Sequence, residues 1–293
     1  GLNLNITGNY AIILNGVRNS VSTAKFGTIV NGIDNKSYGY YASTLNGVKQ
    51  LNFGVFGVIL NGSGNTGSTN TKYSIIGNGV NNIITFNTKF GNIFNGTNNY
   101  TISDYSIVGS GKYNVIRSAS SKFSNILNGS ANTIPFLSNF STISNGNNNI
   151  LSDNIYGFIG SGLKNSAITN SFGVILNGAK NKTSGLFSTI LNGSANTAVL
   201  MPYVLIEQGR QNYVRAYFST IENGLKNSVA NGAYNVSKHS TIQNGSGNSV
   251  YGSYISLENG IGNNLQGKYG FLGSGKNNRS YIQSDGLTFT LKN

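Results

Sequence analysis

The feature that most constrains the fold of this 293-residue chain is a glycine that recurs along almost its whole length. Successive members are 15 to 18 residues apart, except for one step of 21 residues between Gly224 and Gly245. The seventeen glycines are Gly16, Gly32, Gly47, Gly62, Gly79, Gly96, Gly111, Gly129, Gly146, Gly162, Gly178, Gly193, Gly209, Gly224, Gly245, Gly260 and Gly275. A fixed period is typical of stacked structural repeats, so the chain is predicted to form about seventeen coils of about 16 residues.

The residues next to each glycine predict a turn. Asn precedes the glycine in thirteen coils, and Ser110, Ser161, Gln208 and Ser274 take its place in the others. Asn-Gly is a strong turn signal, because both residues tolerate positive φ. Three residues after the glycine, Asn returns in every coil except the one with Gln50. We expect stacking to align these side chains in a structural ladder whose members include Asn19, Asn35, Asn65, Asn132, Asn196 and Asn227.

Two apolar columns predict the core. An aliphatic residue stands three positions before the glycine, as in Ile13 and Ile29, with Thr44 as the polar exception. Two residues earlier, on the same face of a strand, most coils have Gly, Ala or Ser. A second, looser apolar column lies five positions after the glycine, as in Val21 and Ile84. Each coil is therefore expected to contain two short strands whose apolar faces meet.

The predicted fold class is all-β: a single β-solenoid, or flattened β-roll, of about 17 coils of about 16 residues with two short parallel strands per coil. One domain is expected over residues 1–293, with the coils in residues 9–279. Residues 2–6 and 287–291 alternate like strands and lie outside the coil pattern. Segments 1–8 and 280–293 are therefore expected either to cap the roll or to pair with a neighbouring subunit.

An aromatic column stands six positions before the glycine. Sixteen coils have Tyr or Phe there, and the remaining coil has His239, the only His of the chain. We interpret His239 as a ring substituted into a structural column, not as a catalytic or metal-binding residue. Rings in register would form a stabilising ladder. The alternative is a surface that stacks on sugars, and strand parity leaves open whether the rings face outward or fold inward at a corner.

The three Glu residues of the chain, Glu207, Glu222 and Glu258, all lie two positions before the glycine. The simplest interpretation is a solvated ladder neutralised by neighbours such as Arg210 and Lys226. Two alternatives are a weak cation site made of carboxylates and a catalytic pair, because adjacent coils would separate Glu207 and Glu222 by about the distance found in retaining glycosidases. We favour the solvated ladder, and therefore expect no catalytic residue, no metal site and no cofactor.

The same column is apolar in most earlier coils. By strand parity its side chains point away from the core, and an apolar stripe on an outer surface needs cover. We therefore predict an assembly interface, together with the apolar residues of the C-terminal segment. Its residues are Leu14, Val30, Leu45, Leu60, Phe94, Leu127, Leu176, Leu191, Phe289 and Leu291.

Composition excludes several classes of protein. The chain has no Cys, so disulfides, thiolate metal sites and a Cys nucleophile are absent. Only 9% of residues are charged, and the 20 Lys and Arg residues, which give a net charge of +13, are scattered rather than clustered. This pattern predicts no specific nucleic-acid partner. The longest apolar run, residues 198–206, is too short for a membrane span.

The repeat unit, for example Phe187-Ser188-Thr189-Ile190-Leu191-Asn192-Gly193-Ser194-Ala195-Asn196, resembles the "S-x-I-x-G-G-x-x-N" repeats of phage tail fibres and bacterial surface adhesins. It is also similar to the head repeats of trimeric autotransporter adhesins, which form β-rolls. The chain departs from that pattern by using Asn-Gly in place of Gly-Gly. The resemblance spans about residues 9–279 and implies an oligomeric part of a cell or virion surface, with no catalytic residues to transfer.

Three functions follow as expectations. The first is a self-associating structural subunit of an extracellular fibre or filament at a cell or virion surface, whose partner is another copy of itself. The second is a tail-fibre or adhesin shaft that binds surface glycans. The third is a tailspike that cleaves polysaccharides; we expect instead that the chain is not an enzyme.

Overall fold

The computed structural model describes residues 1–23, 25–169, 171–230, 238–281 and 288–289. The chain divides into two compact units, Gly1–Asn148 and Asn149–Asn293. Each is a parallel β-solenoid, and together they have about 17 coils of about 16 residues with two short strands per coil. The described residues include no helix. The predicted fold class is thereby confirmed.

The first unit contains strands β1 to β18, each of two residues. The odd-numbered strands follow the recurring glycine and the even-numbered strands precede it. The odd strands are β1 (Asn5–Ile6), β3 (Ser20–Val21), β5 (Lys36–Ser37), β7 (Leu51–Asn52), β9 (Thr66–Gly67), β11 (Ile83–Ile84), β13 (Tyr100–Thr101), β15 (Val115–Ile116) and β17 (Thr133–Ile134). The even strands are β2 (Ile12–Ile13), β4 (Thr28–Ile29), β6 (Ser43–Thr44), β8 (Val58–Ile59), β10 (Ile75–Ile76), β12 (Asn92–Ile93), β14 (Ile107–Val108), β16 (Asn125–Ile126) and β18 (Thr142–Ile143).

The second unit repeats this order as far as β30. Its odd strands are β19 (Ile150–Ser152), β21 (Ser166–Ile168), β23 (Lys182–Thr183), β25 (Thr197–Ala198), β27 (Tyr213–Arg215) and β29 (Ser228–Ala230). Its even strands are β20 (Phe158–Ile159), β22 (Val174–Ile175), β24 (Thr189–Ile190), β26 (Leu205–Ile206), β28 (Thr220–Ile221) and β30 (Thr241–Ile242). The last strands are β31 (Ser249–Leu257), β32 (Asn264–Leu272), β33 (Arg279–Tyr281) and β34 (Thr288–Phe289).

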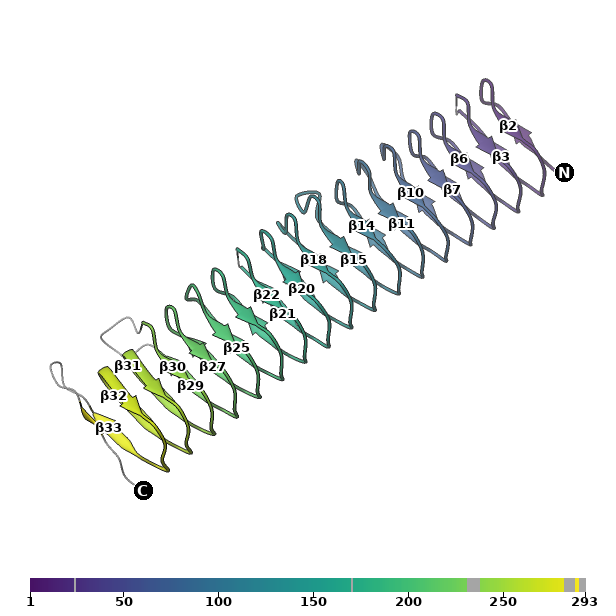
Figure 1. The fold of residues 1–293 in the computed structure, drawn as a ribbon. Coiled ribbons are helices and arrows are strands. Elements are labelled where there is room, and N and C mark those ends of the chain that lie inside the picture. The colour runs from purple at the N-terminus through teal and green to yellow at the C-terminus, as the bar shows by residue number, and fades with distance from the viewer. Residues whose placement is uncertain (24, 170, 231–237, 282–287, 290–293) are drawn as a thin grey trace. The chain divides into compact units, whose positions relative to one another are not determined.

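Within each unit, strands pair in parallel with their counterparts in the next coil, and for the short strands this pairing runs from βn to βn+2 (Figure 1). The nine-residue strands β31 and β32 span both strand positions of their coils and pair with each other. In the first unit β4 pairs with β6, with Ile29 opposite Thr44. In the second unit β22 pairs with β24, with Ile175 opposite Ile190. Because the register aligns identical repeat positions, each sequence column becomes a column in space.

The core of each unit lies between its odd and even strands. The aliphatic residue three positions before the glycine is fully buried in most coils, as in Ile29 and Ile175. The column five positions after the glycine is also buried, and Val21 packs with Ile29 in the first coils. The position five residues before the glycine, which is Gly, Ala or Ser in most coils, also belongs to the core, and Ala42 at this position is inaccessible to solvent. The two apolar columns therefore face each other across a thin core.

The ends of the chain follow the coil pattern more closely than the sequence predicted. β1 pairs with β3 in the usual register, with Asn5 opposite Ser20, and Leu2 forms a bridge with Val17. Residues 2–6 therefore belong to the coil pattern instead of lying outside it. β34 pairs with β32, with Phe289 opposite Phe271, whereas Leu291 lies outside the described residues.

The turn differs from the expected Asn-Gly conformation. The recurring glycine has positive φ, for example 115° at Gly193. Among the described non-glycine residues with positive φ, the Asn before this glycine does not appear, while Ala195, two residues after it, has a φ of 56°. A Cβ at Gly193 would lie 2.1 Å from the carbonyl oxygen of Gly209 in the next coil. Glycine is required there because of close backbone approach as well as φ.

Candidate functional site

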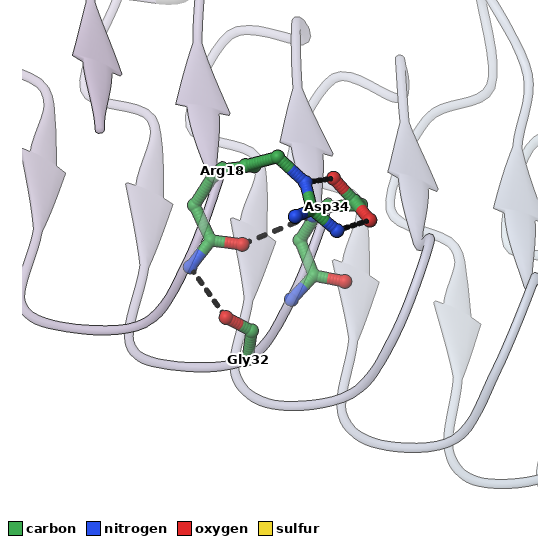
Figure 2. A network of polar contacts seen from close by, with 5 residues as sticks. Arg18, Gly32 and Asp34 are labelled. Atoms are coloured by element: carbon green, nitrogen blue, oxygen red, sulfur yellow. Dashed lines mark hydrogen bonds and ion pairs between the residues drawn. The ribbon is translucent and has the colours of Figure 1, made fainter. Parts of the chain in front are cut away.

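The buried amide ladder joins each coil to the next in three ways. Asn19 is completely buried. Its Nδ2 donates to the carbonyl oxygens of Asn15, within its own turn, and of Gly32, in the next coil, both at 3.0 Å. Its Oδ1 accepts from the backbone N–H of Asn35 at 3.0 Å (Figure 2). One side chain thus bonds to three backbone groups. Two of them, the Asn15 carbonyl oxygen and the Asn35 N–H, would otherwise be unpaired, while the Gly32 oxygen also accepts from the backbone N–H of Val17.

The other predicted members of the ladder have equivalent surroundings. Each is fully buried, and its Nδ2 donates to the carbonyl oxygen of the glycine in the next coil; these residues are Asn35, Asn65, Asn132, Asn196 and Asn227. The side-chain oxygen of Asn196 accepts from the backbone N–H of Asn212 at 3.0 Å. Asn is specific here, because only a short amide offers both donors and an acceptor at this reach.

The coil that ends in Gln50 has two irregular positions. Gln50 Oε1 still accepts from the backbone N–H of Asn65 at 2.9 Å, but its buried Nε2 has no hydrogen-bond partner. In the same coil Thr44 replaces the core aliphatic residue, and its buried Oγ1 also lacks a partner. An unpaired buried polar group costs free energy, so this coil is the expected weak point of the first unit.

An exposed ion pair lies beside the ladder. Arg18 Nε donates to Asp34 Oδ1 at 2.6 Å, and Arg18 Nη2 donates to Oδ2 at 2.7 Å (Figure 2). The hydrogen bonds from Arg18 lower the pKa of the Asp34 carboxyl; partial desolvation opposes this, while the positive charges of Arg18, Lys49 and Lys36 add to it. The pair occupies the same position in adjacent coils and ties them together at the surface.

The aromatic column forms a stacked ladder on the outside of each unit. In the first unit the rings run from Tyr10 to Phe140, and in the second from Tyr156 to Tyr269. Neighbouring ring centroids are 4.7 to 5.2 Å apart, and their planes differ by at most 18°. The rings are roughly half exposed, so the structure resolves the choice left open by strand parity: they face outward.

His239 is one member of this aromatic ladder. Its ring stacks between Phe218, at 4.9 Å, and Tyr254, at 5.2 Å. The only His of the chain therefore takes the place of a Tyr or Phe ring in this stack, as the sequence predicted.

Stacking covers the ring faces. Each interior ring, for example Phe172 between Tyr156 and Phe187, has a neighbour on both faces and presents its edge to solvent. Sugars and nucleobases bind aromatic residues through the ring face. The ladder therefore offers edges, which are poor platforms for either ligand, and its main chemical effect is to join coils.

The aromatic residues adopt an unusual backbone conformation that sequence reasoning missed. Each has a positive φ, such as 60° at Phe172 and 54° at His239. This left-handed region costs an L-residue about 1–2 kcal/mol. A stacked ring pair contributes about 0.5–1.5 kcal/mol beyond area burial, so two stacked neighbours offset the strain. The corner conformation turns the rings outward and away from the core.

A second outward surface lies over the even-numbered strands of each unit. We call it the even-strand face: the residues four and two positions before each recurring glycine, which alternate with the buried core column. Several are strongly exposed and apolar, among them Ile12 at 50%, Leu14 at 66%, Phe94 at 48% and Leu127 at 47%. The other interface residues predicted within the coils also lie on this face: Val30, Leu45, Leu60, Leu176 and Leu191. Of the two predicted C-terminal residues, Phe289 lies in β34 opposite Phe271 of this face, and Leu291 lies outside the described residues.

The even-strand face also includes a column that sequence reasoning missed. Ile12 and Ile75 are exposed four positions before their glycines, and their side chains share the face with residues two positions later. The signal was available in the sequence: none of the seventeen residues at that position is charged. From Ile12 to Leu191, the described residues of the face include no charged side chain at all.

The later coils of the second unit change this face. Glu207, Glu222 and Glu258 occupy it and are partly exposed. Pairing of β26 with β28 sets Leu205 opposite Thr220 and Ile206 opposite Ile221, so Glu207 and Glu222 follow at matching positions of adjacent coils. Both therefore project from the same side of one sheet. A glycosidase pair instead flanks the bond that it cleaves.

In the described part of the chain, no three acidic or His side chains gather as a potential metal site. The same residues contain no helix with the length and apolar character needed to cross a membrane. No protein-family model matches the sequence, and no curated protein matches it either. The site must therefore be interpreted from its own geometry.

Proposed function

We propose that this chain is a self-associating structural subunit of a fibre or filament at a cell or virion surface. The observation that supports this proposal is the even-strand face, which is uncharged and partly apolar from Ile12 to Leu191 on a chain of net charge +13. Exposed apolar stripes of this kind are typical of protein–protein contacts. The fold adds a regular, extensible scaffold, which suits a structural part better than a catalyst.

Charge favours a second copy as the occupant of this face. Two chains of net charge +13 repel each other. All 20 basic residues lie outside the even-strand face, so contact through this face brings the copies together where repulsion is weakest. The acidic coils strengthen the argument, because Glu207, Glu222 and Glu258 complement the positive charge found elsewhere on an identical chain.

The place of such a subunit is part of the proposal. The repeat resembles those of phage tail fibres and bacterial surface adhesins, which supports an extracellular, cell-surface or virion-surface position. Glycan binding along the shaft is less favoured, because the aromatic ring faces are covered by their neighbours. We also propose no hydrolytic role for Glu207 and Glu222; release of sugars from a polysaccharide, lost in Glu207→Gln, would contradict this.

The test of self-association places charge on the even-strand face. In the double variant Phe94→Lys and Leu127→Lys, each new ammonium group would lie in the contact, and we expect the particle to dissociate. The control is Leu163→Lys, which is similarly exposed but lies one position after the glycine, where Lys112 and Lys276 occur naturally.

Sedimentation and electron microscopy of the native particle supply the measurement. We expect the wild type and the Leu163→Lys control to form the same assembly, and the double variant to be monomeric with unchanged circular dichroism. A wild-type chain that stays a monodisperse monomer at high concentration contradicts the proposal, as does a double variant that assembles normally.

A further inference from the structure

The exposed asparagines of the turns are chemically distinct from the buried ladder. At Asn95, Asn192 and Asn223, the backbone N–H of the following glycine donates to the side-chain Oδ1 of the same asparagine at 2.7 Å. All three side chains are exposed. The amide nitrogen of the glycine therefore rests directly beside the side-chain carboxamide of the preceding residue.

This glycine nitrogen is not needed to hold the coils together. In the turn at Asn192, the inter-coil bonds come from the residues on either side: Asn192 N–H donates to the Glu207 oxygen at 2.9 Å, and Ser194 N–H to the Gly209 oxygen at 3.0 Å. Asn95 and Asn223 have the same arrangement. The nitrogen can leave its hydrogen bond without breaking the ladder.

We propose that Asn95, Asn192 and Asn223 are sites of spontaneous deamidation in the folded protein. The glycine nitrogen loses its proton to water and attacks Cγ, which forms an N–Cγ bond. The Cγ–Nδ2 bond breaks, and the nitrogen leaves as ammonia with a proton from water. Water then opens the resulting five-membered succinimide to aspartate or isoaspartate. The only co-reactant is water, and nothing is oxidised or reduced.

The structure also distinguishes asparagines that should react slowly. Asn61 Nδ2 donates to Asn78 Oδ1 at 3.0 Å, and Ser110 Oγ donates to Asn128 Oδ1 at 3.0 Å. These bonds link neighbouring coils, and none of these three described asparagines accepts the hydrogen bond from its own glycine that Asn192 accepts. Because Asn61, Asn78 and Asn128 are also exposed and also precede glycine, they are internal controls that differ in the hydrogen bonds of their carboxamides. Proximity of the reacting atoms then sets the rate.

Deamidation would alter the surface described above. Asn192 follows Leu191 of the even-strand face, so a new carboxylate would border its uncharged part. Isoaspartate would also lengthen the backbone between the Asn192 N–H and its carbonyl oxygen, which accepts from Asn196 Nδ2 at 3.2 Å. The modification therefore adds negative charge to a basic chain and disturbs one rung of the buried ladder.

The test is a time course of the intact folded protein in mildly alkaline buffer, followed by peptide mapping with mass spectrometry. We expect Asn95, Asn192 and Asn223 to convert about tenfold faster than Asn61, Asn78 and Asn128, which corresponds to about 1.4 kcal/mol in activation free energy. The denatured chain should convert all six at similar rates.

A variant provides an independent check. Asn192→Ser should abolish conversion at that site and leave the fold intact, because Ser110 and Ser161 occupy the same column naturally. Equal rates at all six sites of the folded chain would overturn the proposal. So would a folded chain in which none converts while the denatured chain does.

Discussion

The buried amide ladder and the exposed aromatic ladder repeat with the same period but differ in what they tolerate. The amide column is Asn in sixteen of its seventeen coils, because each side chain must place two donors and one acceptor at fixed positions. The aromatic column accepts Phe, Tyr and His239 without loss of stacking. Directional hydrogen bonds inside the protein fix residue identity, whereas stacking at its surface requires only a ring.

The largest expected effect comes from breaking the buried ladder. Asn196→Leu leaves the carbonyl oxygen of Asn192 and the backbone N–H of Asn212 without the partners they have now. At about 1–3 kcal/mol for each unsatisfied buried group, we expect a loss of about 3 kcal/mol. Chemical denaturation and hydrogen exchange at the Asn212 N–H should both report it. The exposed Asn192→Ser is the control; unfolding of Asn196→Leu indistinguishable from wild type would refute the ladder's structural role.

Breaking the exposed ladder should cost less. Phe172→Ala removes two stacked contacts and keeps the left-handed backbone, so we expect a loss of about 1–2 kcal/mol. Phe172→Gly removes the same ring but also relieves the strain of positive φ, and should therefore be the less destabilised of the two. Denaturation of both variants checks this order. If Phe172→Gly is less stable than Phe172→Ala, stacking does not offset backbone strain at this position.

Repairing the one irregular rung should stabilise the first unit. Gln50→Asn restores the length of side chain found in every other coil and should give the unpaired amide its two acceptors, worth about 1 kcal/mol. The gain should appear as a higher denaturation midpoint. Gln208→Asn, at an exposed turn position, is the matched control and should change little. Destabilisation by Gln50→Asn would show that this coil has adapted to the longer side chain.

The smallest effect concerns the exposed ion pair. Arg18 lowers the pKa of Asp34 in the folded protein, so the pair stabilises the fold at pH values above the ordinary Asp pKa of 3.8. This stabilisation is lost as the pH falls from 3.8 through the lower pKa of the folded state. In Arg18→Gln, the pKa of Asp34 should rise toward 3.8. An NMR titration of the Asp34 carboxyl measures this directly, and an unchanged pKa would show that Arg18 is not the cause.

Much of the fold could be predicted from the sequence because register converts each sequence column into a spatial column. The burial of Ile29 follows from period and parity alone, and the alignment of Asn35 with the other ladder residues follows from the period. The positive φ of Phe172 could not be foreseen, since aromatic residues normally avoid that region. Residues 2–6 could not be assigned to the coil pattern from the sequence. The segment 1–8 covers only half a coil, and so few positions of the repeat cannot be recognised.

The even-strand face could be predicted only in part. Leu14 and Leu127 could be predicted, because strand parity places them on the outside of the solenoid, where apolar side chains are unexpected. Ile12 and Ile75 belong to the same surface, but their column also contains Thr, Ser and Asn, so hydrophobicity alone gives no signal. The absence of charged residues would have identified this column, but that signal appears only when all seventeen coils are compared at the same position.

The close approach at the recurring glycine limits how such a chain can evolve. A Cβ at Gly178 would lie 2.1 Å from the carbonyl oxygen of Gly193, and the hydrogen bonds of each turn reach only the adjacent coil. Duplication or deletion of a whole repeat preserves every contact of this kind, because each coil meets a neighbour with the same shape. Insertion of a single residue beside the glycine would instead place a side chain against backbone. Recombination between whole repeats would thus change the length of the chain and keep these contacts.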